Sequence, residues 1–205
     1  KYVSQIEGAK FQEEAYHLLI TKKGILLEAT TPKGMYWGRQ TLEQLKTTKN
    51  KKIYLPQCDI TDWPAFRIRG FMHDVGRSYI PLEELKREIS LLSRYKINVF
   101  HWHLTENQAW RLECRKYPQL NAPENMEREK GKFYTLEEAR QLVEFCKQHQ
   151  VLLIPEIDMP GHSAAFVRTF KTDMQSEKGT QILKDIIDEV CATFDVPYLH
   201  IGTDE

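Results

Sequence analysis

The sequence lacks a long hydrophobic run, a signal-like start and an excess of charge of either sign. No apolar stretch approaches the roughly 20 residues that a membrane-spanning helix needs, so we expect no membrane span in this segment. The start, Lys1-Tyr-Val-Ser-Gln5, lacks the apolar core of a secretory signal. We expect these residues to come from the interior of a longer protein.

Charged residues are balanced, with 29 Lys plus Arg against 29 Asp plus Glu. This balance gives no basic patch typical of nucleic-acid binding, so we expect no nucleic-acid partner. The four cysteines are widely spaced without a C-x-x-C pair, which argues against a zinc site and a dense disulfide framework. We predict separate packed thiols at Cys58, Cys114, Cys146 and Cys191, and neither a metal nor a cofactor.

A globular core is expected, because 41% of the residues are hydrophobic and 11% are aromatic. Residues 1–62 predict the C-terminal part of a small α/β domain. Strands are expected at 15–20 and 25–29, with Gly24 in the turn between them. A helix should begin at Thr31-Pro32, whose residue types suit the N-cap and the first turn. A short strand is predicted at 53–55.

Residues 63–205 alternate between strand-like and helix-like segments. The predicted strands cover 67–75, 97–104, 151–157 and 196–202, and the predicted helices cover 81–95, a segment with a capping box at Thr135 and Glu138, and 180–194. This alternation predicts a parallel sheet, either an open doubly wound sheet or half of a (β/α)8 barrel. No G-x-G-x-x-G or P-loop follows a predicted strand, which disfavours nucleotide binding.

Each predicted strand ends in side chains capable of acid–base chemistry. In a barrel the carboxyl ends of all strands meet at one rim, where active sites form, so we expect these side chains to converge. They are Asp74 and Arg77 after the first strand, His101, His103 and Glu106 on or after the second, Asp158 and His162 near the end of the third, and Asp204 and Glu205 after the fourth.

The adjacent acids Asp204 and Glu205 are the most informative of these residues. Two carboxylates in one cleft tend to separate their pKa values, so that one acts as an acid and the other as a base. Cleavage of a glycosidic bond needs a proton for the leaving oxygen and charge stabilisation at the anomeric centre. An Asp-Glu dipeptide alone is common on solvated surfaces, so its significance depends on the other strand ends.

Four other residues allow more than one interpretation. His101 and His103 share one face of a strand, and their spacing suits metal ligation. A metal-dependent barrel hydrolase is therefore an alternative, although a hydrogen-bonded barrel histidine is the simpler interpretation. The turn at Met159-Pro160-Gly161 should bring His162 back over the rim, although a lone histidine in a loop is usually an ordinary surface residue. Arg77 offers a planar fork of donors for sugar hydroxyls, or else forms a salt bridge to Asp74.

Four motifs occur in a characteristic order and spacing. They are Arg69-Gly-Phe-Met-His-Asp-Val-Gly-Arg77, Lys96-Ile-Asn-Val-Phe-His-Trp-His-Leu-Thr-Glu-Asn-Gln-Ala-Trp-Arg111, Pro155-Glu-Ile-Asp-Met-Pro-Gly-His162 and Leu199-His-Ile-Gly-Thr-Asp-Glu205. Across residues 66–205 the chain resembles glycoside hydrolase family 20, and residues 1–62 resemble the small α/β domain that precedes the barrel in that family. The resemblance implies the first half, about four βα units, of a (β/α)8 TIM barrel.

The resemblance also implies roles for individual residues. Glu205 would be the general acid/base, and Asp204 would orient the 2-acetamido group of the substrate, which is itself the nucleophile and forms an oxazolinium. Supporting residues are implied as well: His162 and Glu106 would buttress the acid/base, Arg77 would bind hydroxyls of the terminal sugar, and His103 and Asp158 would lie behind these groups.

The implied activity is that of an exo-acting β-N-acetylhexosaminidase, which releases terminal β-linked N-acetylglucosamine or N-acetylgalactosamine from glycans in the periplasm or outside the cell. A non-catalytic sugar-binding relative is a further alternative, against which the intact acid pair argues. Glu106 stands where many members have Asp, and Thr203 stands where Gly is frequent. Because the family's sugar-stacking tryptophans belong to the second half of the barrel, we expect the 205-residue piece alone to be inactive.

Overall fold

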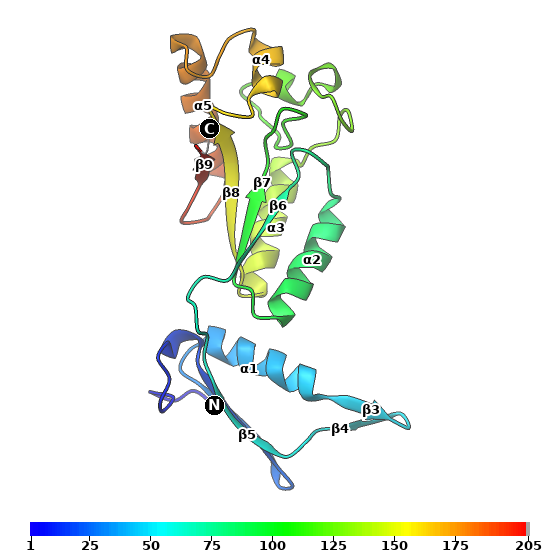
Figure 1. The fold of residues 1–205 in the computed structure, drawn as a ribbon, viewed down its shortest axis with the longest axis vertical. Helices are drawn as coiled ribbons and strands as arrows, with labels where there is room; N and C mark the ends of the chain where they lie inside the picture. Colours follow the sequence, from blue (N-terminus) through cyan, green and yellow to red (C-terminus); the bar gives the residue numbers. More distant parts are fainter. Residues whose placement is uncertain (204–205) are drawn as a thin grey trace. The chain divides into compact units, whose positions relative to one another are not determined.

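The computed structural model describes residues 1–203, so Asp204 and Glu205 lie outside the described residues. The chain divides into two compact units (Figure 1). One comprises residues 1–69 and 91–98, and the other comprises residues 70–90 and the chain from residue 99 onward. Each unit has its own sheet.

The first unit contains an antiparallel sheet in the order β2-β1-β5. β1 (Tyr16–Thr21) and β2 (Gly24–Ala29) form the predicted hairpin, and β5 (Cys58–Asp62) pairs with the other edge of β1. Helix α1 (Pro32–Leu45) begins after its predicted N-cap, Thr31, and packs against the sheet. The buried core consists of Tyr16, Leu18, Ile20, Ala29 and Trp37.

Two features of the first unit were not predicted. β4 (Lys52–Tyr54) overlaps the predicted strand at 53–55, but its pairing with β3 (Thr47–Lys49) in a separate hairpin was not predicted. β5 was missed because its sequence, Cys-Asp-Ile-Thr-Asp, contains two aspartates, which are depleted in strands. Its pairing with β1, rather than its local propensity, makes this segment a strand.

A buried carboxylate anchors a polar network in the first unit. Glu14 ends the short 3-10 helix η1 (Gln12–Glu14) and is buried. It accepts hydrogen bonds from the indole of Trp37 at 2.7 Å, from the guanidinium of Arg69 at 2.5 Å and from the amide of Asn98 at 3.2 Å. Partners from distant parts of the sequence therefore meet at this one side chain.

The second unit contains a parallel sheet in the order β6-β7-β8-β9, whose strands run side by side in Figure 1. The strands are β6 (Gly70–Asp74), β7 (Val99–His103), β8 (Leu152–Met159) and β9 (His200–Gly202). The helices that follow them in the chain are α2 (Leu82–Arg94) after β6, α3 (Leu136–Gln148) after β7, and α4 (Ala164–Phe170) and α5 (Glu177–Thr193) after β8.

The predicted alternation of strands and helices is confirmed, and the chain has an α/β fold. The capping box at Thr135 and Glu138 is present at the start of α3. The long segment between β7 and α3 contains the short 3-10 helices η2 (Pro118–Asn121) and η3 (Pro123–Asn125). Helix α4 was missed, because seven residues are too few for a clear helical period.

The four cysteines are free thiols. Cys114 and Cys146 are buried and Cys58 is half-buried, but Cys191 is exposed, so the expectation of four packed thiols is wrong for Cys191. The reason is its position on α5. That helix buries Ile186 and Val190, four positions apart on one face, and the next residue turns away from this face.

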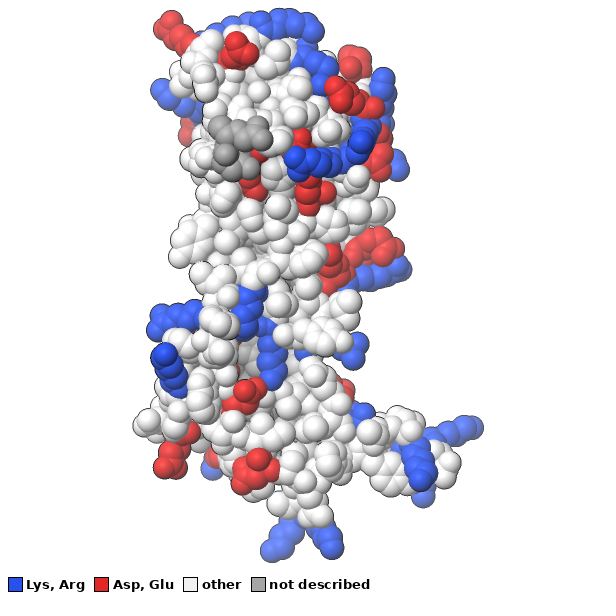
Figure 2. Space-filling view, in the orientation of Figure 1, with Lys and Arg blue, Asp and Glu red and all other residues white. Residues whose placement is uncertain are grey.

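Acidic and basic side chains intermingle on the face of the molecule drawn in Figure 2. Some pair within one helical turn, such as Lys86 with Glu83 at 2.8 Å on α2. Within residues 1–203, no helix is both long enough and apolar enough to cross a membrane.

Candidate active site

One row of side chains crosses the parallel sheet from β6 to β9. The strand register pairs Asp74 with His103, His103 with Glu156, and Glu156 with His200. Residues at one level of neighbouring strands point to the same face of a sheet, so acids and histidines alternate along this acid–histidine row. Nδ1 of His103 lies 2.9 Å from Oε2 of Glu156, and Nδ1 of His200 lies 3.4 Å from its Oε1.

Glu106 is the centre of a second cluster, beyond the carboxyl end of β7. Its side chain is buried, and its Oε1 lies 2.8 Å from Nδ1 of His162 and 2.5 Å from a guanidinium nitrogen of Arg77. Arg77 also forms the ion pair with Asp74 that their spacing suggested. The first three strand ends therefore converge as expected, and each supplies at least one charged or hydrogen-bonding side chain.

Asn107 holds two of these loops together. Its amide oxygen accepts a hydrogen bond from the backbone N–H of Ala164 at 3.0 Å, and its amide nitrogen lies 3.4 Å from Nδ1 of His162. Its own backbone N–H donates to Oε2 of Glu106 at 2.6 Å. We did not predict a role for Asn107. Its place directly after an acid at a strand end was the one available signal.

Arg77 keeps half of its side chain exposed while it pairs with these acids. The hydrogen bond to Asp74 raises the pKa of Arg77, burial opposes it, and the charges of Asp74, Glu106 and Asp158 add to the increase, so the pKa is raised. The guanidinium is therefore a fixed cation with part of its donor edge open to solvent. Such a group suits the binding of a ligand rich in hydroxyl groups.

Asp158 is buried where β8 and β9 approach each other. Its backbone N–H donates to Oγ1 of Thr105 at 2.9 Å. Gly202 has a φ of +71°, and a Cβ at this position would lie 1.7 Å from Oδ1 of Asp158, so only glycine fits. In the sequence, Thr203 and then the predicted catalytic pair Asp204-Glu205 follow directly, and that pair lies outside the described residues.

The two histidines considered as metal ligands both turn toward Glu156. Nε2 of His101 lies 2.5 Å and Nδ1 of His103 lies 2.9 Å from the same oxygen, Oε2. A metal ion shared by both rings, about 2 Å from each nitrogen, would compete with that oxygen for its position. His101, Glu156 and His200 also have ligand atoms within 4.8 Å of one another. The short distances from Glu156 to His101 and His103 favour hydrogen bonds over ligation for these two rings.

The histidines also determine the charge state of Glu156. Burial by itself would raise the pKa of this carboxyl, but the hydrogen bonds from His101 and His103 and their charges hold the pKa well below its ordinary range. We did not predict a role for Glu156. A carboxylate inside the mostly apolar strand β8 was a signal, because a buried charge must have partners.

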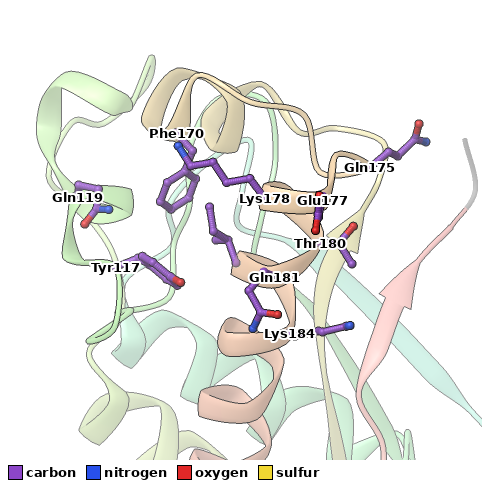
Figure 3. A pocket seen from close by; sticks show the side chains of 10 residues that line it. Tyr117, Gln119, Phe170, Gln175, Glu177, Lys178, Thr180, Gln181 and Lys184 are labelled. Atoms are coloured by element: carbon purple, nitrogen blue, oxygen red, sulfur yellow. The ribbon is translucent and has the colours of Figure 1, made fainter.

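A wide hollow of about 970 Å³ lies elsewhere in the second unit, between the loop after β7 and the start of α5 (Figure 3). Tyr117 and Phe170 form an edge-to-face pair on its lining, with ring centroids 5.3 Å apart. Lys178 and Gln181 of α5 also line it. None of the predicted acids and histidines within residues 1–203 lines it, so the hollow is a different place from the cluster around Glu106.

Two family models match the chain. The model described as glycosyl hydrolase family 20, catalytic domain, matches residues 66–175. The model described as glycosyl hydrolase family 20, domain 2, matches residues 2–63.

Individual relatives agree with these matches. A beta-hexosaminidase of Porphyromonas gingivalis is 35% identical over 237 residues, which cover 100% of this chain and 30% of the relative. A beta-hexosaminidase of Vibrio furnissii is also 35% identical and covers 94% of this chain and 38% of the relative. The chain thus spans about a third of the length of these curated relatives.

Solved structures are similar as well. The exo-β-N-acetylglucosaminidase of Vibrio harveyi in complex with N-acetylglucosamine superimposes with a TM-score of 0.90 at 31% identity, over 100% of this chain and 37% of that one. The Flavobacterium johnsoniae chitobiase superimposes with a TM-score of 0.86 at 36% identity, over 94% of this chain and 32% of that one.

Proposed function

This chain belongs to glycosyl hydrolase family 20, and from that premise we propose that the full-length protein is an exo-acting β-N-acetylhexosaminidase. It removes terminal β-linked N-acetylglucosamine or N-acetylgalactosamine from glycans with retention of configuration. The observation that carries the proposal is the meeting of Arg77, Glu106 and His162 within hydrogen-bonding distance at the carboxyl ends of three successive parallel strands. The relatives named beta-hexosaminidase support the same activity.

The four parallel strands are, in this proposal, the first half of a (β/α)8 barrel. Residues 1–62 are the C-terminal part of the small α/β domain that precedes it. The strand order supports this assignment, because β6-β7-β8-β9 follows the order of the chain, as in a barrel. An open doubly wound sheet reverses its strand order at a switch point, and ligands bind there. In a barrel they bind at the carboxyl ends of the strands.

The proposed reaction is substrate-assisted. Glu205 donates a proton to the leaving oxygen. Asp204 orients the 2-acetamido group, whose carbonyl oxygen attacks the anomeric carbon as the glycosidic bond breaks, which gives an oxazolinium. Glu205 then takes a proton from the water that attacks the anomeric carbon, and the product sugar keeps its configuration.

The described residues support both acids in this scheme. In this scheme His162 supports Glu205, and the buried Glu106 fixes the imidazole, because its Oε1 lies 2.8 Å from Nδ1 of His162. Arg77 presents its exposed donor edge to the hydroxyls of the terminal sugar. Asp158 stands behind the strand end that leads to Asp204.

An assay of the full-length protein tests this function. Aryl β-glycosides of N-acetylglucosamine, N-acetylgalactosamine and glucose should be compared, with and without a thiazoline analogue of the oxazolinium. We expect turnover of one or both acetamido sugars, no turnover of the glucoside, and inhibition by the thiazoline. Sugar binding without turnover, or activity lost on chelation and restored by a divalent metal, would contradict the proposal and favour one of the two alternatives.

A further inference from the structure

We propose that Glu156 is a positioning residue of this site: it fixes His101 and His103 and keeps His103 as the cation that faces the acids at the carboxyl end of the sheet. The inference rests on the proposed function for its catalytic consequence, but its structural part does not. It begins from the alternation of acid and histidine in the row formed by Asp74, His103, Glu156 and His200.

Glu156 contacts three histidines within the parallel sheet. Three imidazole rings lie around its buried carboxylate, with nitrogen–oxygen distances of 2.5 Å to His101, 2.9 Å to His103 and 3.4 Å to His200. A ring held through Nδ1 cannot turn freely, so its Nε2 points in a fixed direction. For His103 that direction leads to Glu106, whose Oε1 lies 3.9 Å from Nε2.

Acids from three neighbouring segments lie around His103. Asp74 comes from β6, Glu156 and Asp158 come from β8, and Glu106 comes from the loop after β7. Burial lowers the pKa of His103, but the hydrogen bond to Glu156 and the charges of Glu156, Asp74 and Asp158 outweigh it, so the pKa is raised. His103 therefore retains its proton at higher pH than an ordinary histidine does.

This cation matters because it balances the acids above it. Glu106 is nearly inaccessible to solvent and contacts His162, the proposed support of Glu205. Arg77 supplies one positive charge to Glu106 from the solvent side, and His103 supplies another from inside the sheet. Loss of the second charge would leave buried carboxylates less well compensated and free to shift, and small misplacements of supporting groups can cost about 100-fold in rate.

The test compares Glu156→Gln with wild type in the full-length protein. The variant keeps a side chain of the same size but loses the charge. We expect kcat to fall by roughly 10- to 100-fold with a smaller change in KM, and the alkaline limb of the pH–kcat profile to move to lower pH. Glu156→Asp, which restores the charge, should move the limb back toward that of wild type.

Glu88→Gln is the matched control. It removes the carboxylate of another histidine–acid pair in the same unit, His73 with Glu88 at 2.6 Å, away from the site. Its pH profile should match that of wild type. An NMR titration of His103 provides a readout that needs no turnover, and its midpoint should fall in Glu156→Gln and stay in place in Glu88→Gln.

These readouts separate the two proposals. If wild type turns over no acetamido sugar, the proposed function fails, and the NMR midpoint still decides whether Glu156 keeps His103 charged. If wild type is active and a folded Glu156→Gln variant shows the same pH profile and the same His103 midpoint, the positioning role is wrong.

Discussion

Oε1 of Glu106 lies 2.8 Å from Nδ1 of His162, and this contact joins the loops that follow β7 and β8. The same oxygen lies 2.5 Å from Arg77, which follows β6. One buried carboxylate atom thus links three strand ends that local sequence does not connect. The geometry of the site should depend on this atom more than on any single loop.

Glu106→Gln should therefore impair the reaction. The amide cannot carry the charge that holds both His162 and Arg77, and we expect kcat to fall by roughly 10- to 100-fold. Glu106→Asp keeps the charge, so it should retain activity within about tenfold of wild type. Initial rates with an aryl N-acetyl-β-glucosaminide measure both effects.

The control for Glu106 is Glu127→Gln. Glu127 also pairs with an arginine, Arg168 at 2.8 Å, but at an exposed position. Exposed pairs contribute little, so the rate should not change. Equal rates for Glu106→Gln and Glu127→Gln would show that Glu106 does not hold the site together.

Variants of the acid pair distinguish the two proposed roles. Glu205→Gln should lower kcat/KM by about 10²- to 10⁴-fold on substrates whose leaving group needs a proton, and by less on a substrate with a very good leaving group. Asp204→Asn should slow both substrates, because it disturbs the attack by the acetamide. The measurement is a comparison of aryl leaving groups of different acidity. Near-normal rates in both variants would refute the substrate-assisted scheme.

Gly202→Ala should disrupt the region around Asp158. The new Cβ would lie 1.7 Å from Oδ1 of Asp158, so that buried side chain or strand β9 must move. Gly131→Ala is a close control, because Gly131 has a similar φ of +77° but its Cβ would come no closer than 3.4 Å to Pro123. Both substitutions incur the backbone cost of about 1–2 kcal/mol.

The two glycine variants separate the cost of a positive φ, which both share, from the steric clash with Asp158, which only Gly202→Ala creates. Thermal unfolding should show a larger loss of stability for Gly202→Ala than for Gly131→Ala, and only Gly202→Ala should lose activity. Equal effects on stability and on rate would mean that the close approach to Asp158 has no consequence.

The sequence predicted those parts of the fold that depend on local patterns. Hydrophobic periodicity located the parallel strands and the longer helices, though not α4, and cap residues such as Thr31 and Thr135 located helix starts. It did not predict β5, whose partner β1 lies far back in the chain. Nor did it show that Glu156 stands level with His103, because strand register is set by long-range pairing rather than by local composition.

The polar network of the first unit could not be predicted from local sequence either, because Glu14 gains its partners only through the tertiary fold. Burial acts to raise the pKa of Glu14, but the hydrogen bond from Arg69 and the charges of Lys33 and Arg69 outweigh it, so the pKa is lowered. A carboxyl with a lowered pKa stabilises the folded state above the pKa of the unfolded chain, about 4.3 for Glu, and that contribution is lost as the pH falls through the folded-state value.

Glu14→Gln should therefore weaken the first unit at neutral pH. The loss of a charged hydrogen-bond acceptor costs roughly 1.5–3 kcal/mol, which would speed hydrogen exchange of the β1 amides roughly 10- to 150-fold where local unfolding limits exchange. The neighbouring exposed residue provides the control, and Glu13→Gln should leave exchange unchanged. The difference between Glu14→Gln and wild type should shrink as the pH is lowered, because wild type then loses the same charge. A difference that stays constant down to low pH would show that the size and shape of the side chain, rather than its charge, stabilise the unit.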